Sequence, residues 1–367
     1  MTPPLRIALV AASPAIVGGH SVQAQGLVER LSAAGHDVTF VPIDASFPKG
    51  LRWMRRWPYA RTLLNEALYF ASLHRLASVD IVHVFSASYW SFLLGPAPAI
   101  VAAKLLRKRV VLHYHSGEAD DHLRRWRRSV RPLLRLVDEI VVPSSYLERV
   151  FASHGYRARV IPNWIDISRF RYRERSVPRP RILSVRNLER HYGVETIMHA
   201  FARLKQRYPE ATLTIAGHGR QERALRLLAD QLAISGIRFV GRIESTGMPE
   251  LYDAADIFVN ASVTDNQPVS ILEAFAAGIP VVSTSTGDIP SILRGGEAGV
   301  LVNADDSEAA AEAIARLLEQ PEFAIKIARR AREEAERYTW RRVGHEWNTL
   351  YAELLSTRSA EVLAHGA

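Results

Sequence analysis

Two carboxylates flank the start of a predicted helix in the second half of the chain. The apolar run 257–262 predicts a strand, and the helix that follows runs from Pro268 to Ala277, with proline in its first turn. Asp265 precedes this helix, where its carboxylate and the N–H groups of the helix start could meet a phosphate-bearing ligand. Glu273 is the one charged residue of an otherwise apolar helix, so it could reach the hydroxyls of a bound sugar. The structural alternative is a helix-capping aspartate and a solvated glutamate.

A second group of polar residues follows predicted strands in the first half. Gly18 and Gly19 come after the first strand and before a helix, an arrangement that lets backbone N–H groups approach a phosphate, although a plain turn explains it equally well. Their spacing is not the dinucleotide GxGxxG pattern. His113 and His115 would share one face of the fourth strand. We favour a polar contact to substrate for His115, which lies nearer the strand end.

A zinc site at these histidines is the alternative. It would need further ligands, and Asp120, Asp121 and His122 are close in sequence. However, their spacing matches no recognised zinc pattern, so we expect no metal.

These residues need a scaffold that brings strand ends together. Short β-branched runs alternate with helical patterns along the whole chain, which is typical of buried parallel strands with crossover helices. Because ligands bind beyond the carboxyl ends of such strands, the candidates above fall where a site is expected. The predicted strands are 6–12, 37–43, 81–86, 110–115, 139–143, 159–162, 181–185, 212–216, 238–240, 257–260, 280–283 and 300–302.

The chain is long enough for two such domains. It has 367 residues and no cysteine, which excludes disulfides and thiolate catalysis. The charged, proline-bearing stretch 171–180 interrupts the alternation and predicts an interdomain linker. We therefore predict domains at 1–172 and 173–339, followed by a terminal helix over 340–358. Ser307 is expected to cap a helix, and Pro321 and Trp340 to begin two more.

The net charge is strongly uneven between the two halves. Residues 1–175 carry a net charge of +12 and the remainder −3, so the first half is expected to face an anionic partner. Two segments there, 51–57 and 122–135, mix arginine with tryptophan, which suits an anionic bilayer surface. A solvated basic face with inward-packed tryptophans is the alternative. Nucleic acid is not expected, since no stacking module or helix-turn-helix pattern is visible.

The lengths of the apolar stretches bear on where in the cell the protein is expected. No apolar stretch is long enough to span a bilayer. The N-terminal run 7–17 is interrupted by Pro14 and lacks a cleavage site. We expect a cytoplasmic protein that can lie peripherally on the inner face of the membrane.

The motifs in combination resemble those of family 4 of the glycosyltransferases, a group of retaining enzymes with the GT-B fold. The family pattern of an acidic residue followed by Glu-Ala-x-Ala-x-Gly-x-Pro-Val-Val corresponds to 265–282. Further matches are Gly18-Gly19, Gly35-His36-Asp37-Val38, Pro162-Asn163, Ala216-Gly217-His218-Gly219 and Gly299-Val300-Leu301-Val302. The resemblance covers about residues 5–350. It implies two Rossmann-like, doubly wound parallel-sheet domains that face each other across a cleft.

The resemblance also implies roles for particular residues. Glu273 would hold the ribose of a nucleotide, Asp265 would contact the donor sugar, and the backbone near Val269 and Ser270 would hold the diphosphate. The turn at Gly217 belongs to this donor side. Arg242 and Ile243 would frame the base, while Gly18, Gly19 and His115 would line the acceptor side. No cofactor and no metal are implied, since the nucleotide-sugar is a substrate and cations with helix ends neutralise its diphosphate.

The sequence departs from the family pattern at the diphosphate. Asn187 and Tyr192 stand where the family has an arginine and a lysine that grip the diphosphate, and Asp265 replaces the usual glutamate. Arg186 and Arg190, with His191, are the candidates to replace the missing cations. The implied function is a retaining, metal-independent hexosyltransferase that moves a sugar from a UDP- or GDP-sugar to a glycan or lipid-linked glycan in cell-envelope polysaccharide synthesis. The alternatives are a catalytically impaired nucleotide-sugar-binding protein and a nucleotide-sugar epimerase on the same scaffold.

Overall fold

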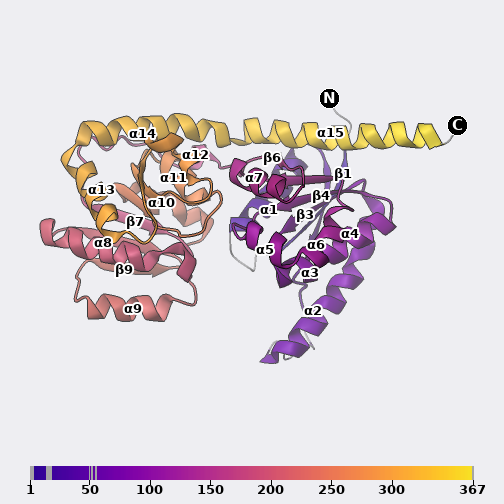
Figure 1. Cartoon of the computed structure of the whole chain (residues 1–367), viewed down its shortest axis with the longest axis horizontal. Coiled ribbons are helices and arrows are strands. Elements are labelled where there is room, and N and C mark those ends of the chain that lie inside the picture. Colours follow the sequence, from indigo (N-terminus) through magenta and orange to yellow (C-terminus); the bar gives the residue numbers. More distant parts are fainter. Residues whose placement is uncertain (1–3, 14–18, 49, 51–52, 54–55, 366–367) are drawn as a thin grey trace. The chain divides into compact units, whose positions relative to one another are not determined.

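The chain folds as two compact α/β units. The computed structural model describes residues 4–13, 19–48, 50, 53 and 56–365 (Figure 1). Unit 1 comprises residues 1–162 and 344–367, and unit 2 comprises residues 163–343. Helix α15 (Trp340–His365) begins in unit 2 and continues in unit 1.

Unit 1 is built on a six-stranded parallel sheet. Its strand order is β2-β1-β3-β4-β5-β6, so the direction of strand addition reverses between β1 and β3. The strands are β1 (Arg6–Ala11), β2 (Asp37–Pro42), β3 (Ile81–Ser86), β4 (Arg109–Tyr114), β5 (Glu139–Val142) and β6 (Arg159–Val160). The helices are α1 (Gly19–Ala33), α2 (Pro58–Ser72), α3 (Trp90–Leu94), α4 (Pro96–Leu105), α5 (Ala119–Arg125), α6 (Arg127–Leu134), α7 (Ser145–Ser153) and the later part of α15.

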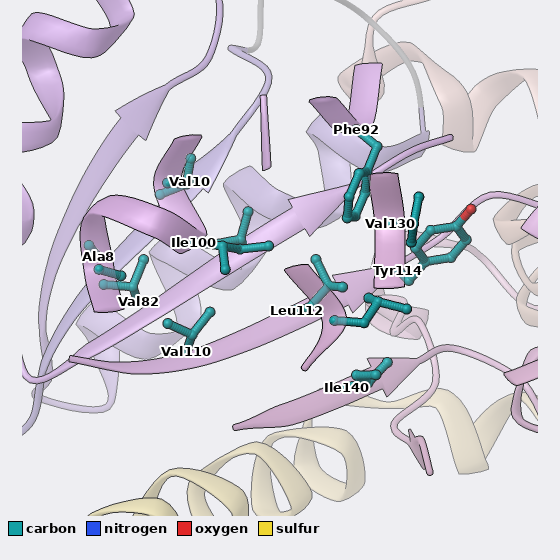
Figure 2. Close-up of a cluster of buried hydrophobic side chains, with 14 of the residues drawn as sticks. Ala8, Val10, Val82, Phe92, Ile100, Val110, Leu112, Tyr114, Val130 and Ile140 are labelled. Carbon is teal, nitrogen blue, oxygen red and sulfur yellow. The ribbon is translucent and has the colours of Figure 1, made fainter. Parts of the chain in front are cut away.

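Side chains alternate between the two faces of this sheet along each strand, and helices cover both faces. On one face, Figure 2 shows strand residues such as Val82 and Leu112 pointing toward Phe92 of α3 and Ile100 of α4. On the other face, the ring of His83 packs against α15, with its centroid 4.7 Å from that of Trp347. The continuous apolar runs in the sequence therefore correspond to strands covered on both sides.

Unit 2 repeats the architecture with a different strand order. Its six parallel strands follow the order β12-β11-β10-β7-β8-β9, so the reversal lies between β7 and β10. The strands are β7 (Arg181–Val185), β8 (Thr212–Ala216), β9 (Ile237–Gly241), β10 (Ile257–Asn260), β11 (Val281–Thr284) and β12 (Val300–Val302). The helices are α8 (Val194–Arg207), α9 (Glu222–Gln231), α10 (Met248–Asp253), α11 (Val269–Ala276), α12 (Ile289–Ile292), α13 (Ser307–Glu319) and α14 (Pro321–Ala335).

The predicted fold class is confirmed, and the strands occur where the sequence predicts them, with ends that differ by one or two residues. Pro321 and Trp340 begin helices as predicted. The cap of α13 was predicted wrongly: the Asp306 side chain accepts from the Ala309 N–H, and Ser307 is the first helical residue. Helix α15 also continues beyond the predicted end at residue 358.

The stretch 171–180, predicted to be an interdomain linker, is packed within unit 2. The guanidinium of Arg175 is buried and donates to the carbonyl oxygens of Tyr252 and Ala255 at 3.1 Å. Arg173 pairs with the buried Asp256 at 3.3 Å. These bonds satisfy charges that an extended linker would leave in water, and the whole stretch belongs to unit 2, which begins at Asn163 and not at residue 173.

Candidate functional site

The switch point of the unit 2 sheet carries an ion pair. Arg186 directly follows β7, and Asp265 lies in the loop after the neighbouring strand β10. The Nη2 of Arg186 lies 2.5 Å from the Oδ2 of Asp265, and each side chain is only 11% exposed. Open parallel sheets bind ligands at this point, because the connecting loops separate there and leave a crevice. The pair therefore places a cation and a carboxylate where the sequence predicts the donor.

Tyr192 supports the cation of this pair. Its ring centroid lies 4.0 Å from the Cζ of Arg186, a cation–π contact that fixes the guanidinium plane. The Nε of Arg186 is buried, and no hydrogen-bond partner for it occurs in the described part of the chain. A buried donor of this kind is costly unless a ligand satisfies it. Of the three cations proposed as replacements, Arg186 is paired with Asp265, whereas the backbone carbonyl oxygen of His191 accepts from the Val263 N–H at 2.8 Å in the loop after β10.

An open pocket lies at the carboxyl ends of β7 and β8. It has a volume of about 470 Å³ and is lined by Asn187, Glu189, His218, Gly219, Arg220 and Glu222. The loops that form it are joined by a hydrogen bond from the Leu188 N–H to the His218 carbonyl oxygen at 2.9 Å. Asn187, at the family's arginine position, thus lines a space that can hold a small polar ligand.

Gly217 makes the close approach of these two loops possible. Its φ is +141°, and a Cβ there would lie 1.9 Å from the carbonyl oxygen of Arg186. We expect Gly217→Ala to lower the free energy of unfolding by about 3 kcal/mol, because the backbone of Arg186 must move. The matched control is Gly295→Ala, where φ is +65° and a Cβ would meet nothing within 4 Å. It should lose only about 1 kcal/mol. Equal shifts of the two urea unfolding midpoints would contradict the prediction.

Glu273 lies on α11 in an environment that opposes its ionisation. The helix is otherwise buried, and the Tyr252 hydroxyl donates to the Oε2 of Glu273 at 2.8 Å. Burial raises the pKa of Glu273 to about 7, against the smaller opposing effects of Tyr252 and of the positive charge of Arg169. A carboxyl group whose pKa is raised in this way is a candidate for a ligand-binding role.

The start of α11 offers the predicted phosphate-binding backbone. The helix begins at Val269, its N-cap is Pro268, and no side chain caps it. Ser270 in its first turn is buried, and its hydroxyl has no hydrogen-bond partner among the described residues. Val269 and Ser270 therefore precede Glu273 on one helix, directly after the loop that carries Asp265.

Three of the predicted donor-side residues lie apart from the ion pair. Arg190 is exposed and belongs to the short turn 190–192 that carries Tyr192. Arg242 and Ile243 follow β9, the edge strand of the sheet, and Arg242 pairs with Glu244 at 3.3 Å. No described contact joins Arg242 to Arg186 or Asp265, so its predicted role at the base stays a prediction.

On the acceptor side, His115 lies just past the end of β4 in unit 1. Its backbone N–H donates to the Ser86 carbonyl oxygen at 3.2 Å, and its ring stacks on Phe85 with a centroid distance of 5.2 Å. Its ring centroid is 4.0 Å from that of His113. Gly19 is the first residue of α1, whereas Gly18 lies outside the described residues.

The histidines behind His115 form a buried hydrogen-bond chain. The Nε2 of His83 lies 3.2 Å from the Nδ1 of His113, and the Nδ1 of His83 lies 2.7 Å from the Tyr351 hydroxyl. Burial lowers the pKa of His83 to about 3, which keeps this imidazole neutral. These hydrogen bonds join α15 to His113 on β4, the strand that ends just before His115.

The residues named for the zinc alternative have other partners in the structure. His122 is buried, its Nδ1 lies 2.8 Å from the Tyr114 hydroxyl, and burial lowers its pKa to about 4. Asp120 pairs with His154 at 2.9 Å instead of approaching His113. Over residues 4–13, 19–48 and 56–365, no group of three or more histidine, aspartate or glutamate side chains could hold a metal ion.

The two arginine–tryptophan segments differ in structure. In 122–135 the arginines are exposed, while Trp126 is partly buried and packs edge-on against Trp90, with ring centroids 5.2 Å apart. In 51–57, Trp53 and Trp57 are both well exposed, and residues 51, 52, 54 and 55 lie outside the described residues. The solvated-face alternative therefore describes Trp126 better than Trp57.

Two contributions to the unit 2 site were missed from sequence. Tyr252 binds Glu273 from a different helix, and His218 lines the cavity from the turn after β8. His218 could have been found from sequence, because it lies within the Gly-x-Gly turn that matches the family pattern. Tyr252 gave none, since only the fold brings it to α11.

Comparison with known proteins covers almost the whole chain. The family model "Glycosyl transferases group 1" matches residues 168–334, and "Glycosyltransferase Family 4" matches residues 17–169. The chain is 28% identical to the sulfoquinovosyl transferase SQD2 of Arabidopsis thaliana, over 93% of this chain and 72% of that protein. It is also 28% identical to a GDP-mannose-dependent α-(1-6)-phosphatidylinositol monomannoside mannosyltransferase of Mycobacterium tuberculosis, over 85% of this chain and 84% of that protein.

Among solved structures, HepE of Anabaena in complex with UDP-glucose is similar in fold. The TM-score is 0.75 at 18% sequence identity, and the match covers 96% of this chain and 100% of HepE.

Proposed function

Because the chain belongs to the group 1, family 4 glycosyltransferases with the two-domain α/β GT-B fold, we propose that it transfers a hexose from a nucleotide diphosphate sugar to a hydroxyl acceptor. The donor is a UDP- or GDP-sugar, and the anomeric configuration is retained. The observation that carries the proposal is the Arg186–Asp265 pair at the switch point, next to the uncapped start of α11 and the cavity at Asn187. The HepE complex supports a nucleotide-sugar as the ligand of this fold.

In the proposed mechanism the chain's own residues hold the donor and stabilise the leaving group. Arg186 and the N–H groups at the start of α11 bind the diphosphate, which gains negative charge as the anomeric C–O bond breaks. Glu273 accepts hydrogen bonds from the ribose hydroxyls, and Asp265 contacts the sugar. The acceptor oxygen bonds to the anomeric carbon from the face that the diphosphate leaves. Its proton passes to the departing phosphate oxygen. No metal is needed, because the cation and the helix start supply the positive potential.

For the acceptor we propose a glycan or lipid-linked glycan of the cell envelope, with His115 and the Gly18-Gly19 turn on the acceptor side. The mannosyltransferase above is named for a phosphatidylinositol acceptor, which supports a lipid-borne hydroxyl. The described helices include none with the length and apolar character of a membrane span. We therefore propose a cytoplasmic enzyme that meets the membrane through the basic segments 51–57 and 122–135.

A thermal-shift series tests donor binding. We expect UDP or GDP, with the matching sugar nucleotide, to raise the Tm, because a ligand at a hundred times its Kd stabilises the folded state by about 2.7 kcal/mol. ADP serves as the comparison base. A Tm that neither UDP nor GDP raises, or that ADP raises equally, would contradict the proposed donor.

Turnover separates the enzyme from a binding protein. The replacement of two family cations by Asn187 and Tyr192 is the observation that favours a catalytically impaired protein. Release of nucleotide diphosphate that depends on an added acceptor supports the transferase. Nucleotide binding without release across a broad acceptor panel supports the impaired protein, and conversion of the donor sugar to its epimer supports the epimerase.

A further inference from the structure

Large apolar side chains are exposed along one face of helix α2. Tyr59, Leu63 and Phe70 are 88%, 72% and 56% exposed. Their spacing of four and then seven residues places them on the same side of a helix. We call these three residues the α2 stripe. In Figure 1, α2 reaches away from the sheet of its own unit.

Helix α2 is attached to unit 1 through a different side. The Asn65 side chain donates to the Ile43 carbonyl oxygen and accepts from the Ala45 N–H, both at 3.0 Å. The buried Tyr69 hydroxyl donates to the Gly95 carbonyl oxygen at 2.7 Å. These bonds fix the rotation of the helix about its axis, so the α2 stripe cannot turn toward the core of its own unit. The stripe is thus a fixed surface feature.

Aromatic and basic residues extend this surface. Trp57, which precedes α2, is 65% exposed, and Trp53 is 62% exposed. Residues 49–75 hold a single acid, Glu66, which is partly buried and hydrogen-bonded to Asn65. Three described bases of the same segment, Arg56, Arg61 and Arg75, are exposed.

We propose that the α2 stripe, together with Trp57, docks onto an anionic lipid bilayer and inserts its side chains at the level of the headgroups. Tyrosine and tryptophan favour that depth, since their rings are apolar and their polar atoms remain hydrated. The cations on the same segment match the negative surface potential of anionic lipids. A helix lying in the interface needs this combination of an apolar face with flanking Lys or Arg. The inference rests on the proposed function in one respect: a lipid-borne acceptor would give the protein a reason to bind the membrane.

Vesicle flotation of the full-length protein tests the docking. The probes are vesicles in which about one lipid in three is anionic, and purely zwitterionic vesicles as the comparison. The test variant is Tyr59→Ser/Leu63→Ser/Phe70→Ser. The matched control is Val22→Ser/Val177→Ser/Leu227→Ser, which removes three apolar side chains that are 51%, 73% and 53% exposed elsewhere. All positions are exposed, so folding should persist, and the UDP or GDP thermal shift verifies it.

We expect wild type and the control variant to float with anionic vesicles and not with zwitterionic ones, and the stripe variant to bind about tenfold more weakly or worse. High salt should weaken binding of the wild type. Three outcomes would overturn the proposal: no flotation of the wild type, equal flotation of the stripe variant, or a wild-type dimer that the stripe substitutions dissociate. Since flotation needs no sugar transfer, a wild type that binds UDP or GDP but does not float with anionic vesicles rejects this inference alone and leaves the proposed function standing.

Discussion

Replacing Arg186 with alanine is expected to lower kcat for sugar transfer by about 100- to 1000-fold, the effect typical of removing one donor that stabilises developing negative charge. Arg186 is the cation held at the switch point, by Asp265 at 2.5 Å and by the ring of Tyr192. Arg190→Ala is the matched control, because Arg190 is exposed on the adjoining turn. It should change kcat by less than about threefold, as surface charges contribute little.

The loss of activity must be separated from loss of folding. Alanine at position 186 leaves the carboxylate of Asp265, which is only 11% exposed, without its cation, and this should lower the free energy of unfolding by about 3 kcal/mol. Assays therefore belong well below the Tm of the variant. Asp265→Asn in the Arg186→Ala background removes the unpaired charge, so it should restore stability. The kcat should stay low, because the cation at the diphosphate and the carboxylate that contacts the sugar are then both absent. Recovery of both would show that Arg186 acts through stability alone.

A second-site experiment asks whether Arg186 takes over the role of the missing family cations. Adding Asn187→Arg and Tyr192→Lys to Arg186→Ala returns an arginine and a lysine to the positions where family members carry them. We expect at least about a tenfold recovery of kcat, because the diphosphate regains positive partners from the same loop. No recovery in a folded triple variant would show that the diphosphate does not lie over this loop.

The sequence predicts the strands well because both sheets are parallel and covered on both faces. Such strands are continuous apolar runs, and β7 and β10 were found at their observed bounds for this reason. Strand order is different, since it depends on pairing between distant segments. Arg186 follows one predicted strand and Asp265 another, but only the order β10-β7 makes them neighbours. The sequence thus names both residues, and the fold makes them a pair.

The incorrect predictions have local and non-local causes. Asp306 and Ser307 are both good helix caps, and sequence preference does not separate adjacent candidates of this kind. The stretch 171–180 has the composition of a linker, yet Arg175 is buried because carbonyl oxygens of Tyr252 and Ala255 happen to converge on it. The convergence of backbone carbonyl oxygens depends on the fold and not on amino-acid composition. Sequence alone therefore does not distinguish a buried arginine from a solvated one.

Glu273 shows how the same limit affects a site residue. Its place on an apolar helix was visible in sequence, but the helix alone allowed either a solvated or a ligand-binding role. The structure adds Tyr252 as a hydrogen-bond donor and surroundings that raise the pKa of Glu273 to about 7. Above that pH the side chain is mostly ionised, and a buried negative charge lowers the stability of the folded state. A ligand that hydrogen-bonds to the carboxylate would offset this loss.

Glu273→Gln should therefore change stability and nucleotide binding in opposite directions. The pKa is raised in the folded state, so the wild type loses stability as the pH rises from about 4.5 through 7, and the neutral glutamine avoids this loss. We expect the nucleotide-free variant to have a higher Tm than the wild type at pH 8 and a similar Tm at pH 4.5. Nucleotide affinity should fall about 10- to 100-fold at pH 8, the value of hydrogen bonds to a charged acceptor, and less at pH 6.

Two measurements, the Tm of the nucleotide-free protein and the Kd by titration calorimetry, follow both effects across this pH range. Glu250→Gln is the control, because Glu250 is an exposed glutamate on α10, the helix that carries Tyr252. It should leave both quantities unchanged.

If Glu273→Gln raised the Tm at pH 8 without weakening nucleotide binding, the carboxylate would be only a buried charge, and other residues would have to hold the ribose. If it weakened binding equally at pH 6 and pH 8, the side chain would act through its shape and not through its charge. Only the opposed changes, both growing as the pH passes 7, identify Glu273 as a carboxylate kept at an energetic cost for its ligand.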